Sequence, residues 1–342
     1  MDEHRLQELL FRHTRVRILV VGDFFLDRYL IIDPARVERS LETGLPAHQV
    51  VEVAATPGAA GTITANLRAL GVAVTALGVI GDDGEGYELR RGLREAGVDE
   101  RAMVIAADRR TPTYVKPTIR DTGAVPYELE RLDIRTRTPT PEHTIAALID
   151  RLRALVVQAQ AVILADQMPE AECGVITARV REEAARLAAH YPHIWFLADS
   201  RQRIGLFNGV IIKPNARECV RAVYADDSSE PPLALVAQAA EQLRQRTGKP
   251  VFVTLGARGI LVVHNKGVLH APAIPVSGPI DVVGAGDSAM AAIAAALCAG
   301  ATLDEAAALG NLTAAVTIRQ IGTTGVAAPD QILALWRVTH ES

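Results

Sequence analysis

This sequence of 342 residues has few cysteines, few aromatic residues and no large excess of either charge. The three cysteines, Cys173, Cys219 and Cys298, are far apart and show no paired spacing. Such a sparse, odd-numbered set argues against a disulfide framework and against a cysteine-ligated zinc site. The net charge of −4 provides no general attraction to nucleic acid or to an anionic membrane. We therefore expect reduced thiols and no nucleic-acid partner.

Long hydrophobic runs are missing as well. The longest run, after Ser288, is mostly alanine and is shorter than the ~20 residues that a membrane-spanning helix needs. The first residues are charged and amphipathic, which is not the pattern of a secretory signal. What the chain does have is 49% hydrophobic and 22% charged residues, the composition of a globular protein with a substantial core. We expect a cytoplasmic location and no membrane partner.

Short apolar runs alternate with helical patterns along most of the chain. Runs such as Arg17–Gly22 end at glycine and have the composition of strands buried on both faces of a sheet. The further strand candidates are 72–79, 161–165, 194–198, 210–212 and 251–255, and the main helix candidates are 62–70, 87–95, 142–158, 171–190, 233–247, 288–299 and 303–318. This alternation predicts an α/β protein with a mainly parallel sheet. We expect residues 1–342 to form a single domain.

Two segments interrupt the alternation. Residues 28–54 contain two strand-like pieces, and residues 112–133 have the pattern of a hairpin with its turn at 121–123. Antiparallel pieces inserted early in an α/β chain suggest a small β-sheet beside the main body. We interpret this sheet as a lid over a binding site, with a decorative hairpin as the alternative.

A glycine-rich turn before an acid and a helix is the main chemical signal. Gly284, Ala285 and Gly286 can turn tightly and expose successive backbone N–H groups, and the helix expected from Ser288 adds its positive end. These groups predict a cradle for a phosphoryl anion. Asp287 beside the cradle could act as a general base that takes the proton from an attacking hydroxyl group. Taken alone, the turn also fits a structural interpretation in which Asp287 caps the helix.

Five motifs, in order, resemble those of the ribokinase-like (PfkB) carbohydrate kinases. Residues 281–287, D-V-V-G-A-G-D, are similar to the C-terminal signature, with valine where members usually have threonine. Residues 57–71 resemble the first signature, and 22–27 the end of the first strand. Residues 213–218 resemble the N-x-x-E motif, and 254–259 the nucleotide-binding T-x-G-x-x-G. The resemblance covers nearly the whole chain and implies a three-layer α/β/α domain with a small β-sheet lid.

The resemblance also implies roles for individual residues. It implies transfer of the γ-phosphoryl group of Mg·ATP to a hydroxyl of a sugar or sugar phosphate, with Asp287 as the base and Gly284, Ala285 and Gly286 as the anion hole. The implied substrate-binding residues are Asp27, Gly58, Ala59, Thr62, Asn66, Lys116, Arg131 and Asp166. The implied ATP-binding residues are Asn215, Glu218, Thr254, Gly256, Gly259, Asp281 and Asn311, with Glu218 and Asp166 near Mg²⁺. Arg201 and Arg203 are further candidates for phosphate contacts, and family lids that pair imply a homodimer.

Within the family, the chain particularly resembles the D-glycero-D-manno-heptose 7-phosphate kinases. Ser40-Leu-Glu42 and the segment 111–116 are among the residues that carry this likeness. The chain departs from the pattern at Ala59, whose methyl group intrudes where substrate would lie, and at Thr62, which lacks the donor and acceptor of an amide. These departures predict a related but different sugar. A nucleoside or other small-alcohol kinase, or a module that only binds nucleotide or sugar, remains an alternative.

Overall fold

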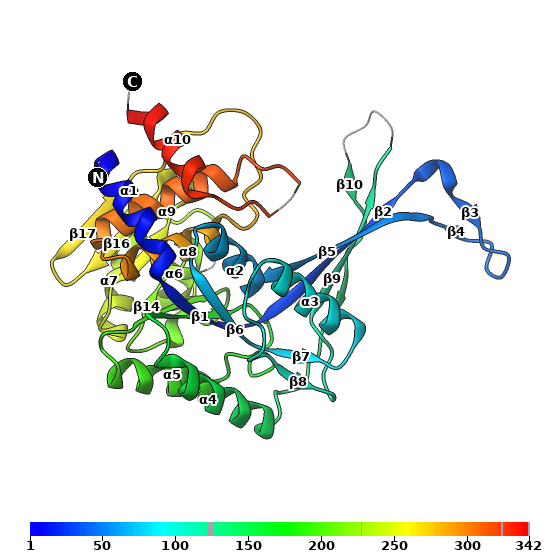
Figure 1. Ribbon diagram of the computed structural model, residues 1–342, viewed down its shortest axis with the longest axis horizontal. Helices are drawn as coiled ribbons and strands as arrows, with labels where there is room; N and C mark the ends of the chain where they lie inside the picture. Colours follow the sequence, from blue (N-terminus) through cyan, green and yellow to red (C-terminus); the bar gives the residue numbers. More distant parts are fainter. Residues whose placement is uncertain (122–125, 227, 323, 341–342) are drawn as a thin grey trace.

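The computed structural model describes residues 1–121, 126–226, 228–322 and 324–340, and Figure 1 shows their arrangement. The main body contains an eight-stranded sheet in the order β17-β16-β15-β14-β13-β12-β1-β6. Its strands are β1 (Arg17–Gly22), β6 (Ala73–Leu77), β12 (Ala161–Asp166), β13 (Trp195–Ser200), β14 (Ile211–Ile212), β15 (Val251–Thr254), β16 (Ile260–His264) and β17 (Gly267–Ala271). The strands from β6 to β15 pair in parallel, as expected, whereas β16 and β17 form an antiparallel edge that we did not predict.

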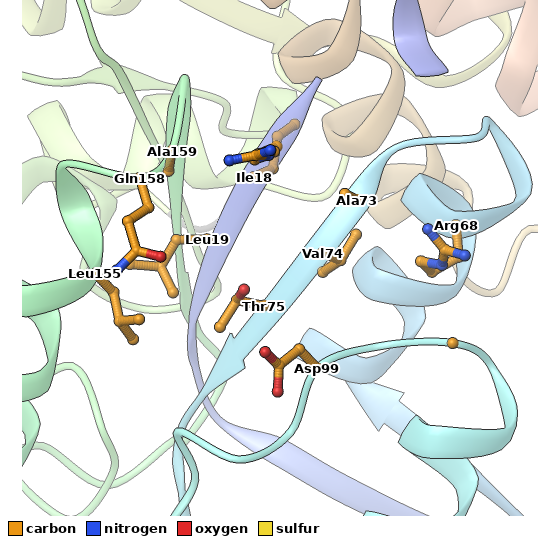
Figure 2. Close-up of a pocket in the computed structure, with 12 residues that line it drawn as sticks. Ile18, Leu19, Arg68, Ala73, Val74, Thr75, Asp99, Leu155, Gln158 and Ala159 are labelled. Carbon is orange, nitrogen blue, oxygen red and sulfur yellow. The ribbon is translucent and has the colours of Figure 1, made fainter. Parts of the chain in front are cut away.

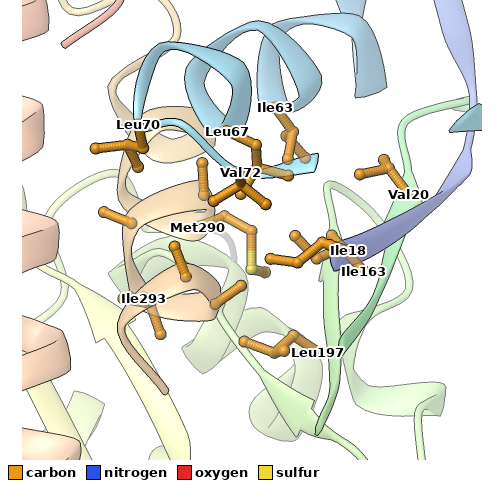
Figure 3. Packing of buried hydrophobic residues seen from close by; sticks show 14 of the residues in the cluster. Ile18, Val20, Ile63, Leu67, Leu70, Val72, Ile163, Leu197, Met290 and Ile293 are labelled. Atoms are coloured by element: carbon orange, nitrogen blue, oxygen red, sulfur yellow. The ribbon is translucent and has the colours of Figure 1, made fainter. Parts of the chain in front are cut away.

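Helices cover both faces of this sheet. Residues of β1 alternate between the two faces: Ile18 and Val20 face one apolar cluster, and Leu19 and Val21 face the other. The first cluster includes side chains of α1 (Glu3–Arg12), α2 (Ala60–Ala69), α3 (Gly84–Glu95), α8 (Ala285–Cys298), α9 (Leu303–Thr317) and α10 (Pro329–His340). The second includes α4 (Glu142–Val156), α5 (Ala178–His190), α6 (Ala216–Tyr224) and α7 (Leu233–Thr247). Figure 3 shows Met290 and Ile293 of α8 packed near Ile18, Ile163 and Leu197 of the sheet. The predicted three-layer α/β/α architecture is therefore correct.

A small, separate sheet extends from the main body (Figure 1). It consists of β2 (Phe24–Ile32), β5 (Val50–Ala59), β9 (Thr113–Ile119), β10 (Tyr127–Glu128) and β11 (Leu132–Ile134). Strand β2 pairs antiparallel with β5 but parallel with β9, so the sheet is mixed. Both β2 and β5 are longer than the predicted strand-like pieces, residues 29–32 and 48–53, and they connect the small sheet directly to the body. Residues 122 and 123 of the predicted turn lie outside the described residues.

Several element boundaries differ from the prediction for local reasons. The expected strand at 72–79 divides into β6 and β7 (Val79–Gly81), and β7 pairs with β8 (Val104–Ala106) instead of joining the main sheet. Helix α5 begins at Ala178, because the preceding residues form a loop that Asp23 holds. Helix α8 begins at Ala285 with Gly284 as its N-cap, so the interpretation of Asp287 as the capping residue is wrong. In the described part of the chain, no helix combines the length and apolar character needed to cross a membrane.

Candidate active site

The motif residues meet at the carboxyl ends of the parallel strands. Asp166 ends β12, Asp199 lies at the end of β13, Lys213 follows β14 and Thr254 ends β15. Helix α8 begins at the same edge, near these residues. Ligands of open α/β sheets bind in the crevice outside the carboxyl ends of the strands, so this edge is the candidate site.

The N-terminus of α8 supplies backbone donors. Gly284 has a φ of 81°, and a Cβ atom there would lie only 2.6 Å from Cγ2 of Thr324, so the turn needs glycine. The N–H of Ala285 donates to the carbonyl of Val282. The N–H groups of Gly284, Gly286 and Asp287 therefore remain, among the described residues, as the donors available to an anion, whereas that of Ala285 is already used.

Asp287 lies half-buried in the first turn of α8. Burial raises the pKa of its carboxyl group to about 7, and the negative charge of Asp199 adds to this increase. The positive charges of Lys213 and Arg201 lower this pKa, and the negative charge of Glu218 raises it. A carboxylate whose pKa is close to neutral pH is suited to accept a proton during a reaction.

Lys213 and Asp199 form a buried ion pair beside Asp287. The Nζ atom of Lys213 lies 3.1 Å from Oδ2 of Asp199, and both residues are buried. Despite the opposing effect of burial, Asp199 raises the pKa of Lys213, so this amine is charged. We did not predict a role for either residue, although both follow strand ends and Lys213 belongs to the motif that contains Asn215.

Asn215 and Glu218 begin helix α6 as a capping box. Oδ1 of Asn215 accepts a hydrogen bond from the N–H of Glu218 at 2.8 Å, and the N–H of Asn215 donates to Oε2 of Glu218 at 2.8 Å. Burial and the charge of Asp199 raise the pKa of Glu218. The pair therefore has a structural function and also places a carboxylate at the crevice.

A hollow of about 810 Å³ lies beside this capping box. Its lining includes Asn215, Arg217, Thr254, Gly256 and Arg258. The volume lies within the range of small-molecule and cofactor sites. The hollow therefore joins the N-x-x-E and T-x-G-x-x-G motifs in one site of suitable size for a nucleotide.

Three predicted ATP-binding residues make structural contacts. Oδ1 of Asp281 accepts a hydrogen bond from the N–H of Val283. The side-chain amide of Asn311 donates to the carbonyls of Ala271 and Pro272 at 2.9 and 3.0 Å. Gly259 has a φ of 93° and no space for a Cβ atom. None of these three residues is among those that line the hollow.

On the other side of the crevice, Asp27 lies where β2 leaves the body. Its carboxylate is 3.0 Å from Nζ of Lys116, which also donates to the hydroxyl of Tyr29 at 3.3 Å. A Cβ atom on Gly58 would lie only 2.3 Å from Oδ2 of Asp27. Ala59, next to it, has a φ of 54°, a backbone conformation that favours glycine. At position 59 the chain therefore keeps a backbone conformation typical of glycine, although alanine adds a methyl group.

The other predicted substrate residues are positioned differently from one another. Thr62 and Asn66 are buried, and Nδ2 of Asn66 donates to the carbonyl of Thr62. Arg131 lies outside the main body, over the ring of Tyr114 at 4.0 Å, and pairs with Asp133. The structure therefore groups Asp27, Gly58 and Lys116, whereas Asn66 and Arg131 contact other residues.

Asp166 is occupied by internal partners. Its carboxylate accepts hydrogen bonds from Ser200 Oγ at 2.6 Å and from the guanidinium of Arg203 at 2.5 and 3.1 Å. Arg203 also donates to the carbonyls of Met168 and Pro169. The exposed Arg201, in contrast, is close enough to Asp287 and Tyr114 to change the pKa of both groups. Of the two arginines, Arg201 is thus the one available to a ligand.

Asp23 is a further buried residue that we did not predict. Its carboxylate accepts hydrogen bonds from the N–H groups of Gln167, Met168 and Val175 at 2.7 to 2.9 Å. These bonds hold the loop after Asp166. An aspartate directly after a buried strand was the signal that could have indicated it.

In the described residues, no group of three or more His, Cys, Asp or Glu side chains could hold a metal ion. Mg²⁺ commonly keeps several waters and binds through nucleotide phosphates with one or two carboxylates. Of the two carboxylates that the resemblance places near Mg²⁺, Glu218 lies at the crevice, whereas Asp166 is already paired with Arg203.

A second cavity, of about 260 Å³, lies at the other end of the sheet. Figure 2 shows its lining, which includes Thr75 of β6, Asp99 and Gln158. Apart from Arg68, which lies in the 57–71 motif, its lining residues are outside the motifs. It is therefore separate from the candidate site.

Most of the chain matches a known protein family. The model of the pfkB family carbohydrate kinases matches residues 18–331. The chain belongs to the pfkB carbohydrate kinase family. This membership confirms the expected class of enzyme, a phosphotransferase with an alcohol group as acceptor.

Curated relatives of this pfkB kinase include proteins named bifunctional protein HldE. The protein from Hyphomonas neptunium is 31% identical over 333 residues, which cover 97% of this chain and 66% of the relative. The protein from Azotobacter vinelandii is 32% identical over 331 residues, covering 95% and 65%. The chain thus spans about two thirds of the length of these relatives. They agree with the resemblance to heptose 7-phosphate kinases that the motifs indicated.

Solved structures confirm the ribokinase-like fold. Phosphofructokinase-2 from Escherichia coli, solved in complex with potassium, has a TM-score of 0.74 and 19% identity, covering 95% of this chain and 99% of that one. Ribokinase from Arabidopsis thaliana, complexed with ribose and ATP, has a TM-score of 0.66 and 16% identity, covering 94% and 98%. At these identities, the similarity concerns the fold alone.

Proposed function

We propose that this protein is an ATP-dependent sugar kinase that uses Mg²⁺ and transfers the γ-phosphoryl group to a hydroxyl of a sugar or sugar phosphate. The HldE relatives favour an acceptor similar to heptose 7-phosphate. The observation that carries the proposal is Asp287, a carboxylate with a pKa of about 7 beside free backbone donors at a helix N-terminus. Asp287 would be the general base.

In this mechanism, ATP occupies the hollow lined by Asn215, Thr254 and Gly256. The acceptor binds between Asp27, Gly58 and Asp287, and its hydroxyl oxygen attacks the γ-phosphorus while its proton moves to Asp287. The bond from the γ-phosphorus to the bridging oxygen of ADP breaks. Backbone N–H groups at the start of α8 stabilise the charge on the phosphoryl group. Bound Mg²⁺ would supply further positive charge, and Glu218 would hold it.

The small sheet would act as a lid in this proposal, formed by roughly residues 28–54 and 112–133, with residues 1–342 as one kinase domain. Support comes from β2 and β5, which carry Asp27 and Gly58 into the acceptor site. Closure of a lid excludes water and so limits hydrolysis of ATP.

We further propose a cytoplasmic homodimer formed through the small sheet. Several of its apolar side chains are exposed, among them Val51, Val53 and Leu132, each about half accessible. Sedimentation of the wild type and of Val53→Lys tests this assignment. A wild-type dimer that the variant converts to monomers supports it, and a wild-type monomer rejects it.

The function is tested by measuring ADP release with Mg·ATP and a panel of acceptors. The panel contains heptose 7-phosphate, fructose 1- and 6-phosphates, fructose, ribose, adenosine and no acceptor. We expect one sugar or sugar phosphate to give much the highest rate. A preference for adenosine would instead indicate a nucleoside kinase, and ATP binding without turnover would indicate a binding module.

Asp287→Asn is the matched variant, because it removes the base with little change in shape. We expect a loss of about 10²- to 10⁴-fold in kcat with unchanged ATP binding. Turnover equal to that of the wild type would reject Asp287 as the base.

A further inference from the structure

The ammonium group of Lys213 is buried and has an ion-pair partner. The residue is 3% exposed, and Asp199 is its ion-pair partner at 3.1 Å. An ammonium group carries three protons to donate, and this ion pair uses one. Burial of a charged group that is only partly satisfied costs free energy, so such a group often serves a ligand.

The position of Lys213 relative to the cradle shows which ligand it could serve. Among the described residues, a Cβ atom built on Gly286 would have one neighbour within 4 Å outside its own helix, the Nζ atom of Lys213 at 3.6 Å. The ammonium group therefore lies next to a backbone donor of the cradle. Asp287 is close enough for Lys213 to lower its pKa.

The surrounding charges explain how the ammonium group is held. Asp199 and Glu218 both raise the pKa of Lys213, so it stays protonated inside the protein. Asp199 lies on β13 and Lys213 follows β14, and the parallel pairing of these strands places the two residues side by side. A cation fixed in this way needs no rearrangement when negative charge develops beside it.

We propose that Lys213 is a catalytic residue that contacts the non-bridging oxygens of the phosphoryl group during transfer, and that Asp199 positions it. This inference rests on the proposed kinase function. In the transfer step, the acceptor oxygen forms its bond to the γ-phosphorus, the bond to the ADP oxygen breaks with its electron pair, and the acceptor proton goes to Asp287. Lys213 keeps its proton and stabilises the transferred group.

The test compares Lys213→Ala with Lys266→Ala, which removes an exposed lysine in the turn between β16 and β17. We expect Lys213→Ala to lower kcat by about 10²- to 10³-fold, as for the loss of one oxyanion donor, with ATP binding changed by less than about threefold. Methylammonium or ethylammonium should restore part of kcat in Lys213→Ala. Lys266→Ala should match the wild type.

A pH profile separates contact with the phosphoryl group from an indirect effect. The charged groups that act on Asp287 are Asp199, Glu218, Arg201 and Lys213. If Lys213 acted only by adjusting Asp287, Lys213→Ala would move the midpoint of the profile to higher pH and keep the plateau rate. We expect the plateau itself to fall. An unchanged plateau, or a loss of kcat that no alkylammonium restores, would overturn the proposal.

Lys213→Ala leaves Asp199 buried without its partner and could impair folding. The double variant Asp199→Asn/Lys213→Met removes both charges at similar volume and keeps the test valid. It should fold, bind ATP and show the same loss of kcat, and a kcat within tenfold of the wild type would overturn the proposal. A wild type that phosphorylates no acceptor would instead reject the proposed function itself.

Discussion

Gly58 and Asp27 lie so close together that Gly58→Ala tests the acceptor site directly. The added Cβ atom would lie 2.3 Å from Oδ2 and 2.9 Å from Cγ of Asp27. Because real Cβ atoms essentially never approach within 3.0 Å, the carboxylate must move by at least 0.7 Å, the difference between 3.0 and 2.3 Å. Lys116 holds the carboxylate at 3.0 Å, so the movement also disturbs this ion pair.

The size of the effect follows from this displacement. A misplacement of about 1 Å in a reacting group can cost about 10²-fold in rate. For 0.7 Å we expect kcat/KM for the acceptor to fall by about 10- to 100-fold. The affinity for ATP should not change, because the nucleotide hollow is lined by other segments.

The assay measures initial rates against acceptor at saturating ATP, and against ATP at saturating acceptor. Gly84→Ala is the control, because a Cβ atom there meets nothing within 4 Å. If Gly58→Ala had the same kcat/KM for the acceptor as the wild type, Asp27 would not set the acceptor position. An equal loss of affinity for ATP would show that the substitution damages the whole site.

Three further predictions concern single groups. The kcat/KM should fall about tenfold per pH unit below pH 7, because Asp287, whose pKa is raised to about 7, must be deprotonated to act as a base; a profile that is flat from about pH 5 to about pH 8 would contradict this. Arg203→Ala should lower the free energy of unfolding by about 3–5 kcal/mol in urea titrations, because it leaves the buried carboxylate of Asp166 without its charged partner; a loss below about 1 kcal/mol would refute that pairing. Ala59→Gly should raise stability by about 1 kcal/mol in thermal unfolding, since the φ of 54° is strained for alanine, and a lower Tm would argue against that strain.

The sequence by itself determined the class of fold and the main chemical motif. Strands such as Arg17–Gly22 are apolar at nearly every position because both faces are covered by helices, and that pattern is visible without a structure. The glycine-rich turn before Asp287 was equally visible, since a tight turn followed by a helix is a local feature. The antiparallel edge formed by β16 and β17 had a similar signal, an apolar run before a turn, which we did not recognise.

Only the tertiary structure decided which charges meet. Asp199 and Lys213 are 14 positions apart in the sequence, and Asp166 and Arg203 are 37 apart, yet each pair is in direct contact. Pairing of parallel strands brings their carboxyl ends to one edge, and this register cannot be read from either strand alone. The raised pKa of Asp287 has the same origin, because burial and the charges around it come from segments distant in the sequence.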